Sequence, residues 1–211
     1  MLGQLREGWT LLFRRSPLLL AVTALNLVLV IALAAFQGLL LPVHFTASGE
    51  EGQLGMVLNS LAFGMLTGSG GYAAAGARAT RRTWLTIALP GSAVGVGLIG
   101  TLPPVGVVFA GAVVLGFFGG ILSTVLGVLM AERIPDGLRG RVMGTQNAIT
   151  TAAPSIGLFG TGVLVEYASL TTAGLAGVAI WLAVVAALPA PALRDLTPVE
   201  AQRSDSPECV V

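Results

Sequence analysis

The chain has 211 residues, of which 55% are hydrophobic and only 10% are charged, and its mean hydropathy is +0.87. Soluble domains carry about 25% charged residues, so this composition excludes an ordinary soluble domain. The net charge of +1 excludes the strong basic bias of a nucleic-acid-binding protein, and the single cysteine, Cys209, excludes an intrachain disulfide framework.

Long apolar runs recur along the chain and predict six transmembrane helices. Each run is long enough to cross roughly 30 Å of hydrocarbon at about 1.5 Å per residue, and lipid leaves the polar groups of a non-helical backbone unsatisfied. The expected spans are residues 18–43, 54–76, 83–101, 105–131, 143–166 and 170–193. We therefore expect an all-α membrane protein with an N-terminal segment at 1–17, a six-helix bundle at 18–193 and a disordered tail at 194–211.

The basic residues are confined to alternate connecting segments. All eleven are arginines. They lie in the N-terminal segment, in the second loop, in the fourth loop and in the tail: Arg6, Arg14, Arg15, Arg78, Arg81, Arg82, Arg133, Arg139, Arg141, Arg194 and Arg203. Six spans place all of these segments on one side, and the positive-inside rule makes that side cytoplasmic. The sequence therefore predicts a multi-pass protein of the plasma (inner) membrane with both termini in the cytoplasm.

Signals of a soluble enzyme are absent from the sequence. It has no Cys/His cluster with metal-ligand spacing and no phosphate-binding glycine loop with a lysine. His44, the only histidine, lies at the outer end of the first span, so no catalytic triad can be assembled. His44 is either an interfacial residue without a role or a proton-linked group in an outer vestibule. We expect no enzymatic activity, no cofactor and no metal site.

Polar residues form a stripe within the fifth span. Asn147, Thr150, Thr151 and Pro154 follow the spacing i, i+3, i+4, i+7 and share one helix face, beside Gln146. Because a proline bends a helix and a polar stripe is unfavourable against lipid, this face should meet protein or a watery cavity. Interhelical hydrogen bonding is the alternative. With polar residues of the first two spans, the candidate substrate path comprises Asn26, Gln37, Asn59, Gln146, Asn147, Thr150, Thr151 and Pro154.

Glycine pairs recur at small-xxx-small spacing, which lets helix backbones approach closely. The pairs are Gly64/Gly68, Gly91/Gly95 and Gly116/Gly120. They predict either ordinary tight packing or the sliding surfaces of a bundle that moves.

The fourth loop carries the main resemblance to a known family. Residues 131–144 read AERIPDGLRGRVMG. This resembles the cytoplasmic loop between the tenth and eleventh helices of major facilitator superfamily transporters, especially the drug- and macrolide-efflux-like branch. Residues 5–18 resemble the segment before the seventh helix of that branch. The arginines at 78–82 resemble a degenerate copy of the family's loop motif, without its acidic residue near Ala75, and residues 153–160 resemble its Gly-Pro helix signature.

The resemblance covers residues 3–195 and implies the C-terminal six-helix half of a twelve-helix transporter, built from two inverted three-helix repeats. It implies secondary transport, with efflux of a small amphipathic molecule. Charged residues of the cytoplasmic loops would then tune an inward gate, or else serve only as topology anchors. These residues are Arg78, Arg81, Arg82, Glu132, Arg133, Asp136, Arg139 and Arg141.

The family's substrate cavity lies between two six-helix halves, so one half is incomplete by itself. The expected partners are the lipid bilayer, a small-molecule substrate and a second six-helix half, which belongs to the same gene product, to a homodimer or to a separate chain. No nucleic acid is expected. The alternative is a non-transporting membrane scaffold or regulatory subunit, or the relic of a transporter.

Overall fold

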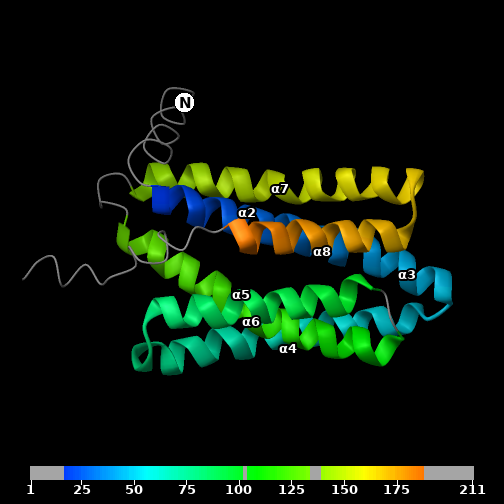
Figure 1. The fold of residues 1–211 in the computed structure, drawn as a ribbon, viewed down its shortest axis with the longest axis horizontal. Coiled ribbons are helices and arrows are strands. Elements are labelled where there is room, and N and C mark those ends of the chain that lie inside the picture. The colour runs from blue at the N-terminus through cyan, green and yellow to red at the C-terminus, as the bar shows by residue number, and fades with distance from the viewer. Residues whose placement is uncertain (1–16, 102–103, 134–138, 188–211) are drawn as a thin grey trace, which may run out of the picture.

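The computed structural model describes residues 17–101, 104–133 and 139–187, and these residues form helices joined by short turns (Figure 1). The all-helical architecture predicted from the apolar runs is confirmed. The expected tail, and the N-terminal segment apart from Pro17, lie outside the described residues.

The first helical rod consists of three consecutive segments. An α-helix, α2 (Pro17–Ala35), passes into a π-helical turn, η1 (Phe36–Leu40), and then into α3 (Leu41–Ser48). Pro42 follows the π-turn and has no N–H to donate to the carbonyl four residues earlier, which favours irregular pairing at this point. The rod ends at Gly49, whose φ of 71° is the left-handed conformation that terminates helices. It is longer than the predicted span because polar residues continue the helix beyond the apolar run.

The remaining helices follow in chain order. They are α4 (Glu51–Ala75) with the 3-10 turn η2 (Gly76–Arg78), α5 (Arg81–Gly100), α6 (Val105–Arg133), α7 (Arg139–Tyr167) and α8 (Leu170–Ala187). Hydroxyl side chains cap two of them. The hydroxyl oxygen of Thr80 accepts the N–H of Thr83 at 3.3 Å, and that of Ser169 accepts the N–H of Thr172 at 3.1 Å.

Four helical stretches of the described chain are long and apolar enough to cross a membrane. They are Thr23–Ser48, Arg81–Gly100, Val105–Glu132 and Met143–Tyr167. The apolar stretch Leu170–Ala186 in α8 is shorter, and α4 is diluted by six glycines and several polar residues. The count of six crossings stays a prediction.

The helices assemble into two groups, which lie one above the other in Figure 1. In one group α6 packs against both α4 and α5, and in the other α2 packs against α7, with α8 beside them. The contact of α8 with α5 joins the groups. The core between the helices is apolar, and its largest fully buried side chain is Trp181 of α8.

Glycines account for the closest helix contacts. A Cβ atom added to Gly64 of α4 would lie 2.6 Å from the carbonyl oxygen of Val113 and 3.1 Å from the Cα of Gly116 on α6. A Cβ atom added to Gly95 of α5 would lie 2.6 Å from the backbone nitrogen of Leu115. Since only glycine allows such approach, the predicted close packing at these pairs is confirmed, and the sliding function stays a prediction.

Candidate functional site

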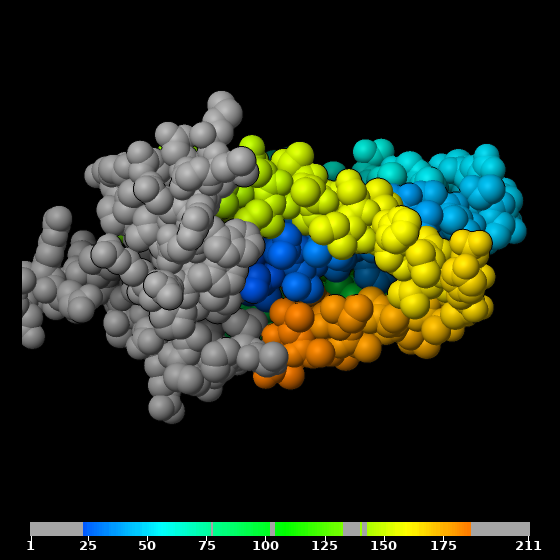
Figure 2. Space-filling view, turned by 90° about the horizontal axis from the view of Figure 1, so that it is seen from above, coloured from blue at the N-terminus to red at the C-terminus, as the bar shows by residue number. Residues whose placement is uncertain are grey.

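A hollow of about 520 Å³ lies between α2 and α7 and is open to the surface of the molecule. Its volume falls within the range of about 300–1,000 Å³ typical of small-molecule sites. It is lined by Asn26, Met143, Gly144, Gln146, Asn147 and Thr150. On this side of the molecule, α2 is set back between α7 and α8 (Figure 2). The hollow therefore brings together one polar residue of the first rod and the polar stripe of α7.

Helical periodicity explains why α7 presents these side chains together. Met143, Asn147 and Thr150 are spaced at i, i+4 and i+7, so they follow one face of the helix. Farther along α7, a Cβ atom on Gly157 would lie 2.8 Å from the carbonyl oxygen of Ile31, so there the backbone of α7 nearly touches α2. The residues that line the hollow lie on the N-terminal side of this close contact in both helices.

The two threonines of the stripe use their hydroxyl protons within α7. The Thr150 hydroxyl lies 3.0 Å from the carbonyl oxygen of Gln146 and 3.1 Å from that of Asn147, and it donates to this pair. The Thr151 hydroxyl donates to the Asn147 carbonyl oxygen at 2.7 Å. Pro154 in the same helix has no N–H for the carbonyl of Thr150, which loses its usual helical donor.

The three amides that line the hollow have no such partner. Within the described chain, the side chains of Asn26, Gln146 and Asn147 form no hydrogen bond. Asn26 and Gln146 are half-buried, and Asn147 is exposed. Each amide carries two N–H donors and one acceptor oxygen. The hollow therefore offers free hydrogen-bonding groups of both kinds.

The other candidates of the substrate path lie elsewhere. Gln37 is half-buried in η1, and Asn59 is exposed on α4. Gln37 shares a face with Asn26, but eleven residues correspond to about 16 Å along a helix, which places it well beyond the hollow. Thr151 is exposed beside the hollow, and Pro154 is half-buried one turn farther along α7.

Two residues that line the hollow, Met143 and Gly144, are not predicted from the sequence. The helical spacing of Met143 from Asn147 and Thr150 is the signal that would have found it. Gly144 carries no such signal, because a glycine has no side chain to mark a face.

Among the loop residues, Arg81 and Glu132 are paired. Both terminal nitrogens of the Arg81 guanidinium donate to the carboxylate oxygens of Glu132, which joins the start of α5 to the end of α6. Close by, the rings of Tyr72 and Trp84 meet edge to face with centroids 5.5 Å apart. The pair thus lies at an ordered helix end rather than on an isolated loop.

The structure describes the side chains of only some of the other charged candidates. Arg78 and Arg82 are exposed. Arg133 ends α6 and Arg139 begins α7, but their side chains and that of Arg141 are outside the described part, as is the whole of Asp136.

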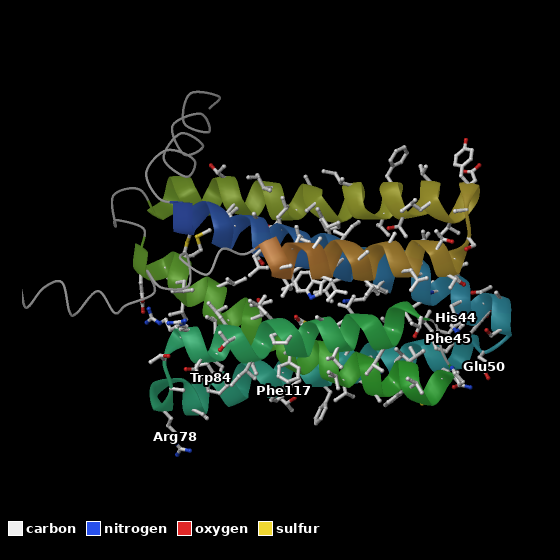
Figure 3. All side chains as sticks on the ribbon, in the orientation of Figure 1. His44, Phe45, Glu50, Arg78, Trp84 and Phe117 are labelled. Carbon is white, nitrogen blue, oxygen red and sulfur yellow. The ribbon has the colours of Figure 1, made fainter. Side chains whose placement is uncertain are left out.

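His44 lies at the end of the bundle opposite to Arg78 and Trp84 (Figure 3). Its ring meets that of Phe45 edge to face with centroids 5.5 Å apart. Across the described residues, no three His, Cys, Asp or Glu side chains gather into a group that could hold a metal ion. The hollow between α2 and α7 is the candidate site because it gathers Asn26 and the polar residues of α7.

Comparison with known proteins relates the chain to efflux pumps. It is 31% identical over 182 residues to the multidrug efflux pump Tap of Mycolicibacterium fortuitum, covering 86% of this chain and 44% of that protein. It is 32% identical over 195 residues to the proteins of the same name in Mycobacterium bovis and Mycobacterium tuberculosis, covering 91% of this chain and 45% of each. The chain thus spans less than half the length of these relatives. No model of a protein family matches the chain. No solved structure matches it significantly.

Proposed function

We propose that this chain forms one six-helix half of an efflux transporter of the major facilitator type, which exports small amphipathic molecules. The observation that carries the proposal is the alignment of almost the whole chain with less than half of proteins named multidrug efflux pumps. The polar hollow between two apolar helices supports it, because polar groups within a membrane mark substrate paths.

The helix contacts support an inverted repeat. Suppose that the rod α2–η1–α3, α4 and α5 correspond in that order to α6, α7 and α8. The contact of α4 with α6 then corresponds to that of α7 with α2. The contact of α5 with α6 then corresponds to that of α8 with α2, and the contact of α5 with α8 corresponds to itself. All of these contacts occur in the bundle. This is the symmetry expected of two three-helix repeats.

A second half has two exposed apolar faces available to it. Phe63 and Leu66 of α4 are 63% and 71% exposed, and Ile156 and Phe159 of α7 are 66% and 77% exposed. Such side chains require lipid or protein around them. We propose that part of these faces meets the second half, which is either the rest of the same gene product, a second copy or a separate chain. In this arrangement both termini are cytoplasmic and the charged loops tune the inward gate.

Export from whole cells tests this function. The chain is expressed alone, and together with the part of the Mycolicibacterium fortuitum relative that it does not match. Cellular accumulation is measured for ethidium, a lipophilic cation, and for radiolabelled chloramphenicol, an uncharged molecule. We expect accumulation of at least one probe to fall when both parts are present. Unchanged accumulation of both probes, with both parts shown to be in the membrane, would contradict the proposal.

A non-transporting subunit is the second candidate. Apart from Glu166 at the end of the fifth span, the six expected spans contain no Asp, Glu, Arg or Lys, whereas ion-coupled transport usually needs such groups within the membrane. A scaffold would copurify with a partner whose transport is unaltered when Gln146, Asn147 and Thr150 are replaced by alanine. Loss of transport in that variant would instead favour the transporter.

A further inference from the structure

The lining of the hollow differs from that of a site built to hold an ion. Among the described residues, the lining comprises three amides, one hydroxyl, one thioether and one glycine, and none of these is ionisable. This described part of the wall therefore offers no partner for an ion pair. Hydrogen bonding is available, because the amides of Asn26, Gln146 and Asn147 have no partner in the described chain.

The direction of these hydrogen bonds can be stated. Each amide offers two N–H donors and a carbonyl oxygen. The hydroxyl of Thr150 already donates its proton to the backbone of α7, so toward the hollow it can only accept. A ligand that satisfies this wall must carry both hydrogen-bond acceptors, such as carbonyl groups, and donors, such as hydroxyl or amide N–H groups.

The apolar part of the wall is adaptable. Met143 has a flexible thioether side chain that adjusts to ligands of different shape. Outside its own helix backbone, no atom of the described residues lies within 4 Å of the position where Gly144 would carry a Cβ atom. The described chain therefore leaves room for a ligand to approach the backbone there. The wall thus combines fixed polar groups with an apolar surface of low shape specificity.

From these features we infer that the hollow between α2 and α7 binds uncharged amphipathic molecules that are rich in hydroxyl and amide groups, and does not bind lipophilic cations. This inference rests on the proposed function, since it names the class of molecule that this half of the transporter recognises. It assigns recognition to neutral hydrogen bonds from Asn26, Gln146 and Asn147.

Binding to the purified chain in lipid nanodiscs tests the inference directly. Chloramphenicol, which is uncharged and carries two hydroxyls and an amide, is the ligand, and tetraphenylphosphonium, a cation without hydrogen-bonding groups, is the competitor. We expect saturable chloramphenicol binding that tetraphenylphosphonium does not displace. Absence of saturable binding, or displacement by the cation at a similar concentration, would overturn the inference.

Matched variants locate the binding. Asn26→Leu and Asn147→Leu remove amides from the hollow, and each is expected to weaken chloramphenicol binding about tenfold, because a lost hydrogen bond of ordinary strength corresponds to such a factor. Asn59→Leu removes an exposed amide from α4, outside the hollow, and is expected to leave binding unchanged. Equal weakening by Asn59→Leu, or none by the two hollow variants, would place the binding elsewhere and overturn the inference.

A charge introduced into the hollow gives an independent readout. Asn147→Asp places a carboxylate on this wall, so tetraphenylphosphonium is expected to begin competing with chloramphenicol. No gain of cation competition would mean that position 147 does not face the ligand, against the inference.

The whole-cell measurement separates this inference from the proposed function. Export of ethidium and chloramphenicol that is insensitive to Asn26→Leu and Asn147→Leu would leave the transporter standing and overturn the inference. Amide-dependent binding in nanodiscs without export in cells would support the inference and contradict the transporter.

Discussion

Arg81 and Glu132, which are 51 residues apart in the sequence, form a bidentate ion pair that connects the start of α5 with the end of α6. The turn between these helices lies at their other ends, so the ion pair closes the open end of the α5–α6 hairpin. The side chains are 33% and 39% exposed, so water screens the attraction. The pair is therefore better suited to fixing the position of the helix ends than to stabilising the whole bundle.

A double-mutant cycle should show a small coupling between these residues. We expect Arg81→Ala and Glu132→Ala to be coupled by about 0.2–1 kcal/mol in the free energy of unfolding, as is usual for exposed pairs. Arg81→Lys should recover only part of this energy, because a lysine cannot donate in two parallel directions. Unfolding in detergent micelles measures the cycle, and Arg82→Ala at the neighbouring exposed position is the control. Full recovery of the coupling energy in Arg81→Lys would contradict the bidentate geometry.

Helical periodicity alone places Asn147 and Thr150 on one face, so this part of the stripe can be derived from the sequence. It does not reveal that Asn26 joins this stripe while Gln37 and Asn59 do not. That distinction depends on how α2 and α7 are placed relative to each other, including their close approach at Gly157 and Ile31, and the sequence does not contain this placement.

The sequence predicts the apolar helices more completely than the contacts of the charged side chains. The sequence predicts that Arg81 and Glu132 belong to loops on the same side of the membrane, but it does not pair them, because pairing requires the relative positions of α5 and α6. The sequence does not predict the π-turn at residues 36–40 either, since its bond from the N–H of Leu41 to the carbonyl of Phe36 departs by a single residue from an ordinary helix.

The contact between α4 and α6 should be sensitive to a single methyl group. In Gly68→Ala the new Cβ atom would overlap the backbone of Phe117, which cannot yield as a flexible side chain would. We expect the free energy of unfolding to fall by about 1–3 kcal/mol, as for other overpacked sites.

The matched control lies on the same helix. Gly70 is exposed, and outside its own helix backbone no atom of the described residues lies within 4 Å of its Cβ position. Gly70→Ala should therefore raise the free energy of unfolding by about 0.5–1 kcal/mol through the better helix propensity of alanine. Thermal unfolding of both variants in one detergent measures the difference. Equal shifts in the two variants would mean that α4 and α6 are not in close contact at Gly68.

Pro154 should weaken α7 next to the hollow. Pro154→Ala restores an N–H that can donate to the carbonyl of Thr150, so we expect the free energy of unfolding to rise, by at most about 3 kcal/mol. Pro90→Ala makes the equivalent change within α5, away from the hollow, and should stabilise in a similar way. Only Pro154→Ala should alter chloramphenicol binding in nanodiscs. A change of binding in both variants would show that the effect is general rather than local to the hollow.

The number of membrane crossings can be decided with three single cysteines. In a Cys209→Ser background, cysteine replaces Ser48, Ala79 or Thr101, all of which are exposed at helix ends. A membrane-impermeant maleimide is then added to intact cells. If the rod α2–η1–α3 and the helices α4 to α8 all cross the membrane, Ser48→Cys and Thr101→Cys lie outside the cell and are labelled. Ala79→Cys then lies inside with the arginines of its loop and is protected.

If instead only the four helical stretches of sufficient length and apolarity cross, the pattern changes at two positions. With α4 remaining on the outer surface, Ala79→Cys would be labelled, and Thr101→Cys, one crossing later, would be protected. Labelling at Ser48 is common to both arrangements and serves as the positive control, and permeabilised cells give the maximal signal at every site. Because Arg78, Arg81 and Arg82 surround Ala79, an outer location would oppose the positive-inside rule, so we expect the six-crossing pattern.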